Sequence, residues 1–172
     1  MRKEPLAASI VLLIILGAQF SLGAGSNNQN DWPMFNHDPE GSRTNPAEDR
    51  LTAKNVKDLK VLWTYPTAGA VAGTPAVVDD IVYAGDTTGQ VYAVRRDGTL
   101  VWMTNVGSPV TASVLVSNQR AIVGDLDGVV HAIDIATGAT EWSTVLDTHP
   151  AAAVYSSATV VDGRIVVGVG AS

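Results

Sequence analysis

The amino-acid sequence predicts an all-β protein built from repeated four-stranded units. Beyond Lys60 the chain alternates between β-branched and aromatic runs and short segments of Gly, Asp, Asn or Thr, which is typical of short antiparallel strands. No segment in this part has the apolar spacing of an amphipathic helix. A pattern of Gly, Asp, Ala and Trp also recurs along the chain, which indicates a repeat architecture.

The expected strands of the first unit follow from these runs. We expect a strand at 61–65, two strands within 76–86 around a turn at Asp79-Asp80, and further strands at 90–96 and 100–106. Tight turns are expected at 86–89 and 97–98, because Asp-Gly and Gly corners allow the positive φ of hairpin turns.

The second unit repeats the first at an offset of about 39 positions, with one extra residue before Gly138, so that residues 74–102 align with 112–142. Four matches have an offset of 39 positions: Gly85 with Gly124, Asp86 with Asp125, Gly89 with Gly128, and Ala93 with Ala132. Three tryptophans, Trp63, Trp102 and Trp142, follow at offsets of 39 and 40. A third copy begins near residue 156 and stops in its second strand.

A four-stranded sheet cannot bury both of its faces alone, so units of this kind pack radially and shield one another. Four strands in a period near 40 residues predict a β-propeller. The sequence holds about two and a half blades, fewer than the roughly four that a closed ring needs. We therefore expect an incomplete propeller and a chain that is a fragment of a longer protein.

The part before the repeats divides into two segments. Residues 1–24 combine Arg2 and Lys3, an apolar run at 6–16 and small residues at Gly23 and Ala24, which predicts a secretory signal peptide. An uncleaved membrane anchor is the alternative, although the apolar run is short for a membrane span. Residues 25–59 are expected to form an irregular lead-in with at most a short helix near 51–59, and residues 60–172 the partial propeller domain.

Composition narrows the possible partners. The 172 residues are 46% hydrophobic and 16% charged, which fits one ordered domain. A net charge of −6 argues against nucleic acid. The chain has no cysteine, which excludes disulfides, thiolate metal sites and thiol nucleophiles. With a cleaved signal peptide the protein would be periplasmic or secreted, without a membrane attachment.

Two stretches of the sequence resemble a known family. The stretch AIDIATGATEW at 132–142 resembles the tryptophan-docking repeat of the PQQ-binding-like β-propellers, the quinoprotein alcohol dehydrogenases, and AVRRDGTLVW at 93–102 is a degenerate copy. The lead-in from DWPMFNHDPEGSRTNP to NVKDLKVLWTY resembles the first segment of these enzymes, most closely in the polyvinyl-alcohol-dehydrogenase-like branch.

This resemblance implies a propeller of about eight blades with pyrroloquinoline quinone (PQQ) and a calcium ion on its axis. Oxidation of an alcohol-type small molecule or polymer would follow, with an electron acceptor such as a cytochrome c. Gly170, Ala171 and Ser172 align with the segment that lines the cofactor, and the metal-binding glutamate would come directly after it. Gly170 stands where many relatives have serine, and Tyr155 where several have threonine. The catalytic aspartate of the family lies further downstream, so we assign no catalytic or metal-binding residue within this chain.

Several polar residues allow a functional and a structural interpretation. Asp125 and Asp127 in GDLDG could suggest a calcium loop, but the matching GDTTG favours a turn. His131 aligns with Tyr92, which favours a packed strand residue over a metal ligand. Ser156-Ser157 are interpreted as the start of a strand, because no base lies at a suitable spacing for a nucleophile.

The two remaining histidines lie in loops. His37 and Asp38 could pair with Arg43 and clamp the lead-in, or act at the mouth of the propeller. His149 lies in a Pro-bounded loop between blades, where it could face a substrate cleft.

The sequence thus favours the N-terminal part of an exported PQQ-dependent dehydrogenase that oxidises alcohol groups, inactive as this fragment alone. A non-catalytic propeller that serves as a binding or assembly scaffold of the cell envelope is the alternative, as is a non-functional truncated remnant.

Overall fold

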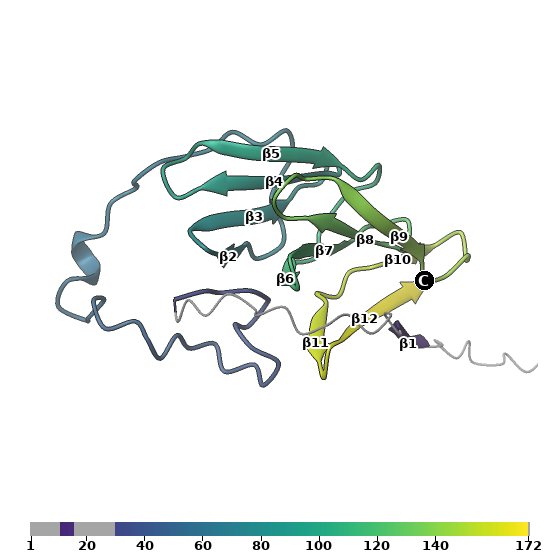
Figure 1. The fold of residues 1–172 in the computed structure, drawn as a ribbon, viewed down its shortest axis with the longest axis horizontal. Helices are drawn as coiled ribbons and strands as arrows, with labels where there is room; N and C mark the ends of the chain where they lie inside the picture. Colours follow the sequence, from purple (N-terminus) through teal and green to yellow (C-terminus); the bar gives the residue numbers. More distant parts are fainter. Residues whose placement is uncertain (1–10, 16–29, 172) are drawn as a thin grey trace, which may run out of the picture.

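The computed structural model describes residues 11–15 and 30–171, and its strands form three antiparallel sheets (Figure 1). The first sheet has the order β2-β3-β4-β5, with β2 (Ala76–Val78), β3 (Ile81–Gly85), β4 (Gln90–Arg95) and β5 (Leu100–Asn105). The second has the order β6-β7-β8-β9, with β6 (Leu115–Ser117), β7 (Arg120–Gly124), β8 (Val129–Asp134) and β9 (Thr140–Val145). Two four-stranded units are therefore present, as the repeat predicts.

The third sheet contains the beginning of another unit. β11 (Thr159–Val161) and β12 (Arg164–Ala171) form a hairpin that matches β2–β3 and β6–β7. β12 also pairs with β10 (Ala152–Ala153) and with β1 (Val11–Ile15). The rest of the predicted signal peptide, 1–24, lies outside the described residues, and its role stays a prediction.

The turns between the first and second strands of each unit share one backbone conformation. Asp79 and Asp80 have φ of 51° and 61°, and the equivalent Asn118 and Gln119 have 50° and 61°. Two consecutive positive φ values define the hairpin turn that matches the twist of the flanking strands. In the third unit Asp162-Gly163 forms the same turn. The predicted turn at Asp79-Asp80 is thereby confirmed.

The expected strand at 61–65 is wrong, because this segment is irregular and its Val61 and Leu62 are 81% and 82% exposed. Strand geometry needs a neighbouring strand, and this segment pairs with none of the described strands. Trp63 still takes the position expected from the repeat. Its Nε1 donates to the Arg96 carbonyl at 2.6 Å, and its ring lies against Gly98. The expected helix near 51–59 is reduced to one 3₁₀ turn, η1 (Val56–Asp58).

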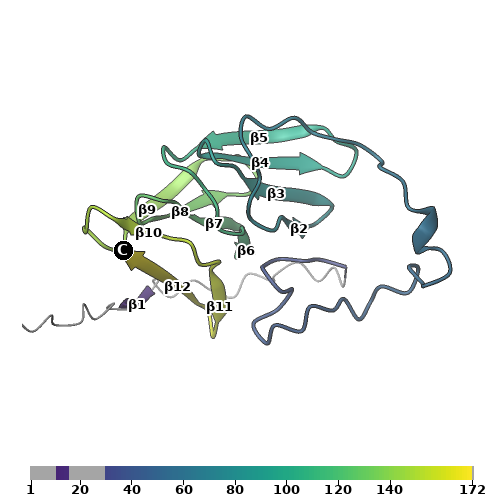
Figure 2. The same ribbon diagram turned by 180° about the vertical axis from the view of Figure 1, so that it is seen from behind.

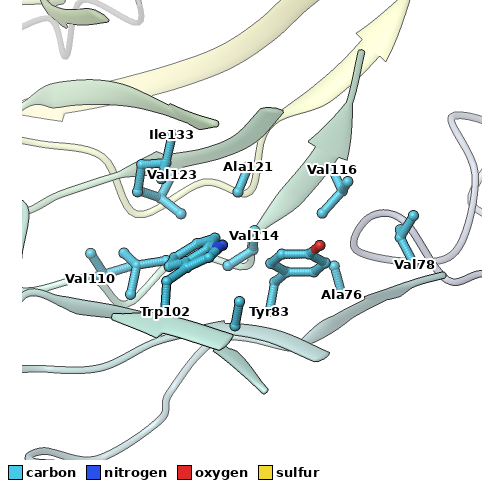
Figure 3. Close-up of a cluster of buried hydrophobic side chains, with 12 residues drawn as sticks. Ala76, Val78, Tyr83, Trp102, Val110, Val114, Val116, Ala121, Val123 and Ile133 are labelled. Atoms are coloured by element: carbon cyan, nitrogen blue, oxygen red, sulfur yellow. The ribbon is translucent and has the colours of Figure 1, made fainter. Parts of the chain in front are cut away.

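The main core lies between the first two sheets (Figure 3). Tyr83 and Trp102, both from the first sheet, lie beside each other with ring centroids 5.9 Å apart. Val123 and Ile133 of the second sheet pack against them. These side chains are almost fully buried, as is expected when each sheet covers the face of the next.

The start of the lead-in joins all three units at their first strands. Trp32 exchanges two backbone hydrogen bonds, of 2.7 and 2.8 Å, with Val77 in β2. The Pro33 carbonyl accepts a hydrogen bond from the Val116 amide in β6, and the buried Met34 packs in the core of the second and third sheets. Figure 2 shows this segment running beneath β2 and β6 towards β11. The lead-in therefore holds neighbouring units together.

Gly124 is expected to be intolerant of a side chain, because a Cβ there would collide with both Val154 Cγ1 and Val154 Cβ. Gly124→Ala should lower the free energy of unfolding by about 1–3 kcal/mol, measured by urea denaturation. Gly170→Ala is the matched control, since a Cβ at Gly170 meets nothing within 4 Å. Equal stability of Gly124→Ala and the wild type would contradict this close packing.

Candidate functional site

Several of the residues singled out in the sequence lie at one edge of the sheets, which we call the crossover edge. It contains the turns 86–89 and 125–128, the crossovers 106–114 and 146–158 between units, and the end of β12. Each crossover runs over a turn of the preceding unit. The Val110 amide donates to the Asp86 carbonyl at 3.0 Å, and the equivalent Val154 amide donates to the Asp125 carbonyl at 2.8 Å.

The predicted cofactor residues lie at this edge. Gly170 and Ala171 end β12, where they pair with Ala153 and Ala152 of the second crossover. Both are exposed, and the space beside Gly170 is open. Ser172 lies outside the described residues. An open glycine and a neighbouring alanine present a surface nearly free of side-chain atoms.

The two crossovers place Thr111 and Tyr155 at equivalent positions. Their register is fixed by serine hydroxyls, because Ser113 Oγ accepts from the Thr74 amide at 2.9 Å and Ser157 Oγ accepts from the Ser113 amide at 3.1 Å. The Thr111 hydroxyl is buried and has no hydrogen-bond partner among the described residues. Tyr155 is 67% exposed. The sequence singled out Tyr155 but missed Thr111, whose only signal is its alignment with Tyr155.

Asp86 organises the crossover edge of the first unit. Its side chain is fully buried, and its carboxylate accepts hydrogen bonds from the Gly69, Thr88 and Gln90 amides and from the Thr88 and Tyr92 hydroxyls. Burial alone raises the pKa of this carboxyl, but the hydrogen bonds from Thr88, Tyr92 and Gly69 outweigh it and lower the pKa to about 2. Asp86 is thus a structural anion that fixes its own turn and the segment around Gly69.

Asp125 repeats this arrangement in the second unit, but with an imidazole as its partner. Oδ1 accepts from the Asp127 and Val129 amides, which confirms the predicted turn. Oδ2 lies 2.8 Å from His131 Nε2, and His131 Nδ1 lies 2.8 Å from Ser143 Oγ. His131 is 6% exposed and therefore packed, as predicted. Sequence reasoning missed Ser143, although the hairpin register places it opposite His131.

The remaining candidates have local roles. His149 is exposed before β10, and its Nδ1 accepts from the Ala151 amide at 3.1 Å. Ser156 Oγ bonds both the amide and the carbonyl of Gly168. Ser156 and Ser157 precede β11 rather than start it. A substrate contact by His149 stays a prediction.

The expected pairing of Arg43 with His37 and Asp38 is wrong. His37 Nδ1 and Asp38 Oδ2 do pair at 3.1 Å, but the Arg43 guanidinium donates to Asn36 Oδ1 at 3.0 Å. Asp38 instead receives hydrogen bonds from the side chain and amide of Ser42, and with His37 these lower its pKa to about 2. The left-handed backbone at Asn36, His37 and Arg43 turns the guanidinium towards Asn36.

Two further features concern metals and membranes. Within residues 11–15 and 30–171, no three His, Asp or Glu side chains gather closely enough to hold a metal ion. No helix in the described part of the chain is long and apolar enough to cross a membrane.

Comparison with known proteins identifies a family. A model of the PQQ-like repeat family, described as outer membrane protein assembly factor BamB, matches residues 44–172. The chain is 28% identical to 1-butanol dehydrogenase (cytochrome c) of Thauera butanivorans over 99% of its length, which is 26% of that protein. It is 30% identical to a polyvinylalcohol dehydrogenase of Pseudomonas sp. over 68% of its length and 20% of that protein.

Comparison with solved structures finds the same kind of relative. The quinohemoprotein alcohol dehydrogenase ADHIIG of Pseudomonas putida HK5 matches 85% of this chain and 24% of its own chain, with 28% identity and a TM-score of 0.76. The chain therefore spans about a quarter of the relatives that it matches. The family match, the repeated sheets and the related quinoproteins together show that this chain belongs to the PQQ-like β-propeller repeat family.

Proposed function

We propose that this chain is the N-terminal part of an exported PQQ-dependent dehydrogenase that oxidises alcohol groups. The observation that carries the proposal is the alignment with 1-butanol dehydrogenase (cytochrome c), which extends over 99% of this chain at 28% identity. The open surface at the end of β12 supports it. The substrate would be an alcohol-type small molecule or polymer, and the electron acceptor a protein such as a cytochrome c.

The residues at the crossover edge fit part of a site for a planar quinone. Gly170 and Ala171 offer a surface on which a ring can lie, and the exposed Tyr155 offers an aromatic side. Thr111 brings a buried hydroxyl without a partner, which a polar ligand atom would satisfy. These four residues would hold PQQ. When bound, PQQ supplies the hydride acceptor for alcohol oxidation.

A calcium ion finds no such fit among the residues that the structure describes. It prefers six to eight oxygen ligands, and the described residues contain no cluster of acidic side chains that could supply them. The carboxylates of Asp86 and Asp125 are already engaged in hydrogen bonds to their turns and to the following strand. The calcium site of the proposed enzyme would therefore need residues from elsewhere in the protein.

The test is a titration of PQQ into the protein expressed from the complete gene, with and without calcium, followed by quenching of tryptophan fluorescence. We expect saturable binding, and Gly170→Val should weaken it at least about tenfold by filling the open surface. Val145→Thr on the exposed edge of β9 is the control and should bind as the wild type does. Absence of saturable binding at all PQQ and calcium concentrations would overturn the proposal.

An envelope scaffold is the second candidate. It is favoured by the description of the matching family model, which is that of an outer membrane assembly factor. A scaffold would export and fold normally but would not bind PQQ, so the same titration separates the two candidates. Fractionation of cells, with intact mass of the exported protein, tests export and removal of residues 1–24.

A further inference from the structure

Asp125, His131 and Ser143 form a continuous hydrogen-bonded array within one hairpin of the second sheet. Asp125 Oδ2 lies 2.8 Å from His131 Nε2, and His131 Nδ1 lies 2.8 Å from Ser143 Oγ. The aspartate and the histidine are 2% and 6% exposed, whereas Ser143 is exposed on β9. A buried acid, a buried base and an accessible hydroxyl thus stand in the order that activates a serine.

The array distinguishes the second unit from the first. The equivalent positions of the first unit hold Asp86 and Tyr92, and the residue opposite Tyr92 is Met103. The Tyr92 hydroxyl donates to Asp86 and accepts from the Ala68 amide, so its hydrogen-bonding capacity is met within the fold. The first unit therefore keeps the same turn with a tyrosine and a methionine at these positions. The turn of the second unit does not require the imidazole of His131 or the hydroxyl of Ser143.

The hydrogen bonds determine which ring nitrogen carries the proton. A carboxylate only accepts hydrogen bonds, so His131 must donate from Nε2 to Asp125. Nδ1 of the neutral ring is then an acceptor, and the hydroxyl of Ser143 donates to it. This is the tautomer that a general base needs, although the two ring nitrogens have exchanged the roles they have in most serine hydrolases.

The backbone of Ser143 supplies a donor for a developing negative charge. The Leu146 amide donates to the Gly128 carbonyl, which makes these residues a hydrogen-bonded pair. Pairs alternate along an antiparallel ladder, so Ser143 and His131 form a pair without backbone hydrogen bonds, in which side chains lie closest. The Ser143 amide therefore points away from β8, to the edge of the sheet where no other described strand pairs with β9.

We propose that Ser143 is a nucleophile for ester-type acyl and phosphonyl electrophiles, with His131 as its general base and Asp125 as the group that orients the imidazole. A bond forms between Ser143 Oγ and the electrophilic carbon or phosphorus, and the hydroxyl proton passes to His131 Nδ1. The leaving group departs and takes up this proton. With an ester, water then cleaves the acyl-serine and releases the carboxylic acid.

The test uses a fluorophosphonate probe on the full chain, with intact mass and peptide mapping as readouts. In the labelling step the Oγ–P bond forms and the P–F bond breaks, releasing fluoride. We expect one adduct, located on Ser143. Ser143→Ala should abolish it, and His131→Gln should slow labelling at least about 100-fold, as is typical for loss of a general base.

The matched control converts this array to that of the first unit, with His131→Tyr and Ser143→Met in one variant. Its thermal unfolding should remain close to that of the wild type, because Asp86 and Tyr92 show that the turn accepts this pair, while labelling disappears. Three results would overturn the proposal: no adduct on the wild type, an adduct at another serine only, or an unchanged labelling rate of Ser143 in His131→Gln. None of them depends on PQQ binding.

Discussion

Replacement of Trp102 by alanine is expected to lower the free energy of unfolding by about 3–5 kcal/mol, because it removes the largest side chain between the first two sheets. Trp102 is 7% exposed and packs beside Tyr83. Its Nε1 also donates to the Ile135 carbonyl of the next unit at 2.8 Å. The loss combines a cavity, the transfer of a large apolar surface and a carbonyl without its partner. Urea denaturation followed by circular dichroism measures it.

Two further variants divide this effect. Trp102→Phe keeps much of the ring but loses the hydrogen bond to Ile135, so it should cost about 1–3 kcal/mol. Trp63→Ala removes the equivalent ring from a partly buried position outside the described sheets, so it should cost less than Trp102→Ala. If both tryptophans proved equally costly, the stabilisation would come from the contact with the glycine turn and not from burial between sheets.

The repeat allowed most of the fold to be predicted, because the same local chemistry recurs at each offset. Gly85 and Gly124 are needed where a crossover valine lies on the backbone, and Asp86 and Asp125 are needed to satisfy the amides of the turn that follows. Such requirements are local, so they leave a readable pattern. The segment 61–65 has the same pattern, but strand geometry needs a partner, and the sequence of one segment does not show whether a partner is present.

The candidate site was less predictable, because its contacts join residues that are far apart in the sequence. Alignment with Tyr92 showed that His131 packs on a strand, but the role of Ser143 depends on the cross-strand register. The pairing of Arg43 with Asn36 depends on left-handed backbone at three residues without a glycine. Composition and spacing do not encode such conformations, which is why His37 and Asp38 seemed natural partners of the arginine.

Asp86→Ala is expected to lower the free energy of unfolding by about 4 kcal/mol. The carboxylate is the acceptor for three amides and two hydroxyls, and each buried donor left without a partner costs about 1–3 kcal/mol, partly recovered by water and relaxation. The segment around Gly69, which leads into β2, and the turn at Thr88 should loosen together. Hydrogen exchange of the Gly69, Thr88 and Gln90 amides would report this loosening residue by residue.

The free energy of unfolding at acid pH tests the role of the Asp86 carboxylate with a substitution that, unlike Asp86→Ala, leaves no cavity. Its pKa is lowered from 3.8 to about 2 in the folded protein, so the unfolded chain binds the proton more tightly. The carboxylate therefore contributes about 2 kcal/mol to the free energy of unfolding, which is fully present above about pH 5 and is lost as the pH falls through 2.

Asp86→Asn removes the titrating group, so its stability should fall less steeply between pH 5 and 2 than that of the wild type. Asp58→Asn, in the exposed 3₁₀ turn η1, is the control and should leave the curve nearly unchanged. An equally steep decline in Asp86→Asn would assign the acid sensitivity to other carboxylates and would show that Asp86 does not hold its turn as an anion.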